Sequence, residues 1–114
     1  MSLFNKTVDL VFEIFSDSAA FRKYKDGKYE SRYNRAVIDI MLYYFSQLEY
    51  MELAIEHKAE ICTKFQELCS TDNAFMAALE STTKSLDAVH TRFRKWGEAL
   101  SEVIGVTLYI PQGY

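Results

Sequence analysis

The spacing of apolar residues along this chain predicts helices over most of its length. A first stripe recurs every three or four residues, as on one face of a helix, and consists of Phe4, Val8, Val11, Phe12 and Phe15. A second helix is expected after Asn34, a residue type favoured immediately before a helix. Its apolar face is wide, which is typical of a helix packed on more than one side. That face consists of Val37, Ile38, Met41, Leu42, Phe45 and Leu48, broadened by Ile40 and Tyr44.

The second half of the chain carries three further helical patterns. A third helix is expected over residues 49–69, with its glutamates facing outward and an inward face of Ala54, Ile55, Ile61, Cys62, Phe65, Leu68 and Cys69. Asp72 is expected to cap a short helix through Leu79, and Ser85 to cap a long last helix. The last helix carries Leu86, Val89, Phe93, Trp96, Leu100, Val103 and Ile104 at helical spacing. Gly105 then fits the position after a helix end.

Two segments depart from the helical pattern. Residues 23–31, "KYKDGKYES", form the clearest loop, because Asp26-Gly27 favours a turn with a left-handed position. Residues 106–114, "VTLYIPQGY", alternate like a strand, but a lone strand has no partner here, so we expect a tail or the start of a following segment. The sequence therefore predicts an all-α fold, a single compact bundle of four to five helices over residues 1–105 with a short extended C-terminal tail.

Composition narrows the class of protein. The chain has 114 residues, 49% of them apolar and 25% charged, which suits one soluble globular domain. No apolar run approaches the ~20 residues that span a bilayer, and the first residues lack a signal-peptide pattern. Cys62 and Cys69 lie seven residues apart on one predicted helix, roughly 10 Å apart and too far for a disulfide. Two such thiols are typical of a reducing compartment. We therefore expect a cytoplasmic protein without membrane contact.

Positive charge is concentrated in two short stretches. The net charge is −3, yet residues 21–35, "FRKYKDGKYESRYNR", hold six of the thirteen Lys and Arg residues against two acids. A second cluster, "TRFRKW", falls on the last helix, where residues 92 and 95 share a face. If that face abuts the loop, the two clusters form one basic patch that can neutralise phosphates while tyrosines stack on bases. The candidate nucleic-acid-binding residues are Arg22, Lys23, Lys25, Lys28, Arg32, Arg35, Arg92 and Lys95.

A structural or protein-contact role is the alternative for these residues. Arg22 and Arg35 can instead pair with Asp39 or Glu30 and close the loop onto the second helix. The wide apolar faces, together with Tyr43, Tyr44 and Tyr50, also allow a stand-alone protein-interaction or oligomerisation domain, if part of that surface stays exposed.

The sequence offers little for catalysis or metal binding. His57 and His90 are the only histidines, and Ile61 occupies the position one turn after His57 where a zinc-binding helix needs His or Glu. The two cysteines fall in the second half of their predicted helix, away from the N-terminal end that lowers a thiol pKa. No glycine-rich phosphate loop is present. We therefore expect no catalytic residue, no metal site and no cofactor.

The order of these features resembles a helical region of modular bacterial defence proteins, those with an N-terminal ParB/sulfiredoxin-like domain as in GmrSD-type modification-dependent restriction systems. The matching positions, over about residues 21–105, are Phe21-Arg22, Asn34, Ala36, Val37, Ile38, Asp39, Phe65, Leu68, Phe75, Leu79, Ser81, Thr82, Arg92-Phe93 and Trp96. The family's catalytic Asp-Gly-Gln-Gln-Arg type motif and its His-Asn-His nuclease module are absent from these residues. The resemblance therefore implies a non-catalytic module that contacts DNA or neighbouring domains of a longer protein.

Overall fold

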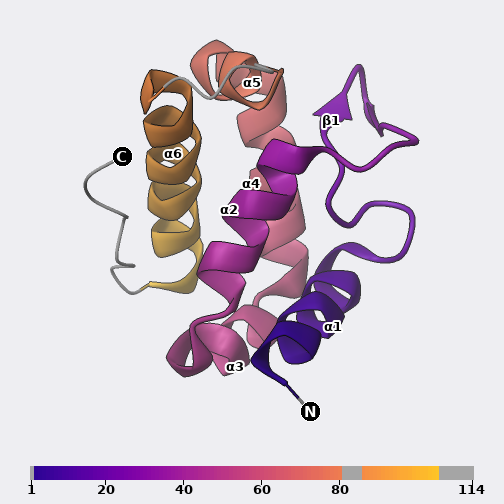
Figure 1. Cartoon of the computed structure of the whole chain (residues 1–114), viewed down its shortest axis with the longest axis vertical. Helices are drawn as coiled ribbons and strands as arrows, with labels where there is room; N and C mark the ends of the chain where they lie inside the picture. Colours follow the sequence, from indigo (N-terminus) through magenta and orange to yellow (C-terminus); the bar gives the residue numbers. More distant parts are fainter. Residues whose placement is uncertain (1, 81–85, 106–114) are drawn as a thin grey trace.

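The computed structural model describes residues 2–80 and 86–105, and apart from one short hairpin this part of the chain is all-α (Figure 1). Its elements are α1 (Leu3–Phe15), β1 (Tyr24–Lys25), β2 (Lys28–Tyr29), α2 (Arg35–Phe45), α3 (Leu48–Glu56), α4 (Lys58–Thr71), α5 (Asn73–Glu80) and α6 (Leu86–Ile104). The predicted all-α class is confirmed, whereas the predicted number of four to five helices is wrong, since the described residues form six. The expected tail over 106–114 and the expected cap at Ser85 lie outside the described residues.

Three predicted helix ends are confirmed by their backbone and side-chain geometry. Asn34 Oδ1 accepts a hydrogen bond from the Val37 amide at 3.0 Å, and Asp72 Oδ1 accepts one from the Phe75 amide at 3.0 Å. Each side chain satisfies a donor that the first turn of its helix leaves without an intrahelical acceptor. Gly105 follows α6 with φ +76°, the left-handed conformation that glycine adopts at helix ends.

The predicted third helix is two helices. The helix is interrupted at His57, whose φ of −118° lies outside the helical region. The His57 amide donates to the Ala54 carbonyl at 3.2 Å. α3 lies at one end of the bundle, and α4 runs through its middle (Figure 1). Ile55, expected to face inward, is 43% exposed. The inward residues Ala54 and Ile61 are seven apart and stay in helical register across the break, so the apolar spacing contains no sign of it.

The polar loop at 23–31 contains a small antiparallel hairpin. Tyr24 pairs with Tyr29 and Lys25 with Lys28, while Asp26 and Gly27 both have positive φ, 54° and 79°. Two consecutive left-handed residues form the turn that matches the twist of a two-residue hairpin loop. The predicted turn is therefore confirmed, and the strands are too short to give a recognisable sequence pattern. The Tyr29 hydroxyl accepts from Gln66 Nε2 at 3.2 Å, which joins the hairpin to α4.

The core is organised around one aromatic ring on α4. Phe65 is 1% exposed and packs edge-to-face against Phe15 of α1, Phe75 of α5 and Trp96 of α6, with ring centroids 5.7, 6.2 and 5.3 Å away. Edge-to-face pairs at these separations add stabilisation beyond the apolar area they bury. Four helices therefore converge on a single side chain.

A buried hydrogen bond joins α2 to α6 beside this cluster. The Tyr44 hydroxyl donates to the Phe93 carbonyl at 2.8 Å, and Tyr44 is 1% exposed. A tyrosine buried this deeply needs a partner for its hydroxyl, since an unsatisfied one costs about 1–3 kcal/mol. The bond fixes the distance between the two helices. Because Tyr44 is buried, it is not available for the tyrosine-rich self-association surface that the sequence suggested.

We expect Phe65→Ala to lower the free energy of unfolding by about 3–5 kcal/mol, because it removes the ring against which three other helices pack. The matched control is Phe4→Ala on α1, a side chain that is 62% exposed. It should change stability by less than about 0.5 kcal/mol. Chemical denaturation of the two variants and the wild type measures both effects. Equal losses in the two variants would contradict the central position of Phe65.

Candidate functional site

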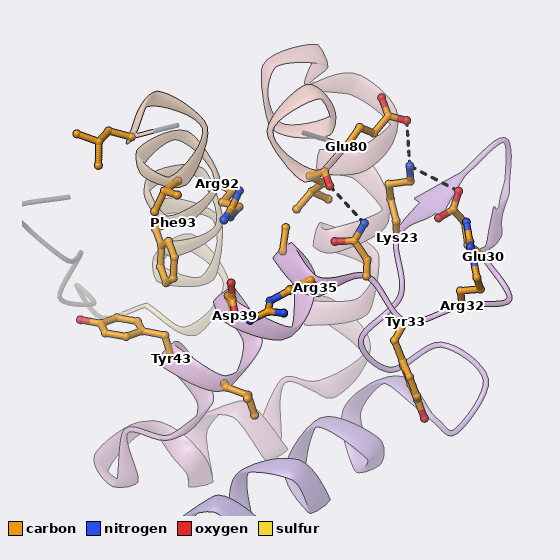
Figure 2. A pocket seen from close by; sticks show the side chains of 16 residues that line it. Lys23, Glu30, Arg32, Tyr33, Arg35, Asp39, Tyr43, Glu80, Arg92 and Phe93 are labelled. Carbon is orange, nitrogen blue, oxygen red and sulfur yellow. Dashed lines mark hydrogen bonds and ion pairs between the residues drawn. The ribbon is translucent and has the colours of Figure 1, made fainter. Parts of the chain in front are cut away.

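An open groove with a volume of about 1110 Å³ lies where the residues before α2 meet α2, α5 and the start of α6 (Figure 2). Its charged lining residues are Lys23, Glu30, Arg32, Arg35, Asp39, Glu80 and Arg92. Its aromatic lining residues are Tyr33, Tyr43 and Phe93. The groove thus brings together four of the eight candidate residues, from both of the basic stretches that lie far apart in the sequence.

Two of the eight candidate residues, Lys23 and Lys25, are bound by the same acid, Glu80. Lys23 is buried, and its Nζ lies 2.9 Å from Glu80 Oε2 and 3.5 Å from Glu30 Oε2. Lys25 Nζ reaches the same Glu80 oxygen at 3.1 Å. The hydrogen bonds from Lys23 and Lys25 lower the pKa of Glu80 from its ordinary value of 4.5. These contacts hold the hairpin against the end of α5 and neutralise both lysines.

Arg22 and Lys95 are also engaged inside the fold. Arg22 Nη1 donates to the carbonyls of Asp17 at 2.7 Å and Ala20 at 3.2 Å, and its guanidinium lies 4.6 Å from the centre of the Tyr33 ring. Lys95 Nζ binds Asp72 Oδ2 at 2.8 Å, next to the cap of α5. Lys95 does not line the groove, so residues 92 and 95 do not act as one exposed basic face.

Among the described residues, neither Arg22 nor Arg35 forms the ion pair with Asp39 or Glu30 that the sequence suggested. Arg22 binds backbone carbonyls instead. Arg35 is exposed on the first turn of α2, with Asp39 one turn further along. The loop is therefore closed onto the bundle by the ion pairs of Lys23 and Lys25 with Glu80 of α5, and neither arginine pairs with an acid among the described residues.

The unneutralised positive charge of the basic stretch is concentrated at three exposed residues. Lys28 lies in the hairpin, and Arg32 and Arg35 lie at the rim of the groove (Figure 2). Within residues 2–80 and 86–105, no hydrogen bond or ion pair holds any of the three side chains. Tyr33, between the two rim arginines, is 57% exposed. The rim thus presents two guanidinium groups and one aromatic ring to solvent.

Arg92 differs from the other groove residues because its charge is buried. It is 8% exposed, and its Nη1 donates to the Ala78 carbonyl at 3.3 Å. Arg92 Nε is buried and lacks a hydrogen-bond partner, as does the neutral Nε1 of Trp96. In the part of the chain that the structure describes, no carboxylate lies within 4 Å of the Arg92 guanidinium.

The thiols and His57 are held in structural contacts. Cys62 Sγ donates to the Ile14 carbonyl at 2.9 Å, and burial raises the pKa of this thiol. Burial also raises the pKa of Cys69 to about 11, so both groups are protonated near neutral pH. His57 Nδ1 lies 2.9 Å from Glu60 Oε1 at the start of α4. The described residues contain no group of three or more potential metal ligands.

Comparison with known proteins finds no similarity: no family model, no curated protein and no solved structure matches this chain. The resemblance to the restriction proteins therefore stays a prediction based on the order of its sequence features. A search of the described helices for one long and apolar enough to cross a bilayer also finds none.

Sequence reasoning missed the acids and carbonyls that complete the site. Glu80 is 57 residues from Lys23 along the chain, and the Asn34 amide donates to the Leu79 carbonyl across 45 residues. Neither contact has a local signal, since each depends on how α5 docks beside α2. The Asn34 cap of α2 could be predicted from its residue type, but the hydrogen bond from its side-chain amide to the Leu79 carbonyl could not.

The pairing of Glu80 with Lys23 and Lys25 predicts a pH dependence. A carboxylate whose pKa is lower in the folded than in the unfolded protein stabilises the fold at pH values above its unfolded-state pKa. This stabilisation is lost as the pH falls through its folded-state pKa. For Glu80 the loss should begin near pH 4.5 and continue below it. We therefore expect the stability of Glu80→Gln to change less than that of the wild type between about pH 5 and pH 3.

The matched control for this measurement is Glu52→Gln, at an exposed position on α3. It should retain the acid dependence of the wild type when thermal unfolding is followed across the same pH range. Identical pH profiles for Glu80→Gln and the wild type would show that the two lysines do not lower the pKa of Glu80.

Proposed function

We propose that this chain is a non-catalytic helical module that contacts nucleic acid through the rim of the groove, with Arg32 and Arg35 as the phosphate-binding residues. The observation that carries the proposal is that Arg32 and Arg35, which flank Tyr33 in the sequence, are exposed and have no acid partner among the described residues. Four other candidate residues are instead engaged within the fold. Arginines with free guanidinium groups neutralise phosphates, and an exposed ring between them offers a surface for base stacking.

The proposal places this module in a restriction-like defence protein of the GmrSD type, where it contacts DNA or neighbouring domains. The order of motifs in the sequence supports this context. The aromatic core and capped helices support a folded unit that presents a surface, and the protonated thiols near neutral pH fit a module without a nucleophile. Lys28 is exposed in the hairpin but does not line the groove, so it lies outside the proposed contact.

The experiment compares DNA binding by the wild type and Arg32→Gln/Arg35→Gln at several salt concentrations. The logarithm of the affinity should fall linearly with the logarithm of salt concentration, and the double variant should reduce this slope by roughly 1.4 to 1.8, because two phosphate contacts are lost. Fluorescence anisotropy with labelled DNA measures both quantities. Thermal unfolding should first show that the double variant is folded.

The control is Arg94→Gln on α6, which removes an exposed guanidinium outside the groove that Glu98 already pairs at 3.4 Å. It should bind DNA with the salt slope of the wild type. The proposal fails if wild-type binding is absent at low salt, or if the double variant and the control have the same slope.

Self-association is a second candidate function, favoured by apolar side chains exposed on two helices that pack together. Leu3 and Phe4 on α1 and Ile55 on α3 are each more than 40% exposed. Light scattering at two protein concentrations tests it, with a concentration-dependent rise in mass expected if these residues form an interface. A constant monomer mass would exclude this candidate while leaving nucleic-acid binding to its own experiment.

A further inference from the structure

We propose that Arg92 binds a phosphate on the inner wall of the groove, and that the module consequently takes a single strand of nucleic acid in preference to a duplex. This inference rests on the proposed function and deepens it. Figure 2 shows the Arg92 side chain extending from α6 into the space between α6, α5 and the start of α2.

The first argument is the unsatisfied hydrogen-bonding capacity of a buried cation. A guanidinium carries five N–H donors in a planar fork. The structure gives Arg92 one acceptor, the Ala78 carbonyl at 3.3 Å, slightly beyond the usual range for N–H···O bonds. Its Nε has none. A buried charge with so few partners destabilises the free protein, and an oxyanion seated against it would remove that penalty.

The second argument is that no acid of the groove pairs with Arg92. Glu30 and Glu80 both bind Lys23, and Glu80 also binds Lys25. Asp39, the remaining acid of the lining, lies more than 4 Å from the nitrogens of every cation that the structure describes. The residues that the structure describes therefore supply no direct counter-ion for Arg92. A planar fork matches the two oxygens of a phosphate group, which favours this anion over a single-point acceptor.

The third argument separates a single strand from a duplex. Arg92 is 8% exposed, whereas Tyr33 at the rim is 57% exposed. A duplex is a stiff rod whose phosphates reach exposed side chains, but they do not enter a groove to meet a buried one. A single strand bends freely, so one phosphate can reach Arg92 inside the groove while a base further along the strand stacks on Tyr33. The Arg22 guanidinium, 4.6 Å from the Tyr33 ring centre, supports that ring in the folded protein.

The experiment measures binding of an oligodeoxythymidine and of a duplex to the wild type, Arg92→Met and Arg92→Lys. Methionine removes the charge at similar volume, and lysine keeps the charge but lacks the fork. Both variants should bind the single strand roughly ten- to hundredfold more weakly, because that is the typical contribution of hydrogen bonds to a charged group. Affinity for the duplex should be unchanged. Arg94→Met, on the exposed side of the same helix, is the control and should bind both as the wild type does.

Thermal unfolding supplies a second readout that a purely structural arginine would not give. Without ligand, Arg92→Met should unfold at the same temperature as the wild type or higher, because it removes a buried unpaired charge. The oligonucleotide should raise the unfolding temperature of the wild type and leave that of Arg92→Met nearly unchanged. A lower unfolding temperature for Arg92→Met without ligand would instead assign Arg92 to the fold and overturn the inference.

The remaining outcomes separate this inference from the proposed function. Equal single-strand affinity in the wild type and both Arg92 variants would overturn the inference, while dependence on Arg32 and Arg35 would leave the proposed function standing. A wild type that binds neither nucleic acid would overturn both. Inorganic phosphate at matched ionic strength should stabilise the wild type less than the oligonucleotide does. Equal stabilisation by the two would identify a site for the free ion and contradict single-strand binding.

Discussion

The Phe65 ring on α4 is the contact on which the arrangement of the other helices depends. It packs edge-to-face against rings from α1, α5 and α6, so those three helices are positioned relative to one another through one side chain. The Tyr44–Phe93 hydrogen bond then sets the distance of α2 from α6. Because the Tyr44 hydrogen bond and the Phe65–Trp96 contact position α2 and α6, the groove that these helices help to line is a consequence of core packing. Its shape does not depend on the exposed residues at its rim.

The basic stretch that dominates the sequence has two different uses in the folded protein. Arg22 binds backbone carbonyls of the segment that follows α1, and Lys23 and Lys25 attach the hairpin to Glu80 at the end of α5. Arg32 and Arg35, only a few residues further along, remain exposed at the rim. Clustering in the sequence therefore overstates the charge available to a ligand, because the internal contacts neutralise part of it. Arg92 adds one positive charge that is buried without an acid beside it.

The sequence predicted those features that have a local physical cause. The caps at Asn34 and Asp72, the left-handed turn at Asp26-Gly27 and the helical class all follow from residue types at short range. The break at His57 could not be predicted, because the apolar spacing continues in register across it. The partners of Lys23 and Arg92 could not be predicted either, since both depend on the docking of α5. The eight candidate residues stay a prediction as a binding set, and their separation into internal and exposed groups required the tertiary structure.

The central claim is that ligand contact is confined to the groove, although basic residues extend well beyond it. Chemical-shift mapping of the isotopically labelled chain during titration with a short single-stranded DNA tests this most directly. The account predicts that the largest shifts fall at residues 32–35 and 89–93, including the Arg92 Nε–H signal, while α3 and the outer face of α4 stay unchanged. Shifts centred on the hairpin, on α3 or on α1, with the Arg92 signal unmoved, would contradict it.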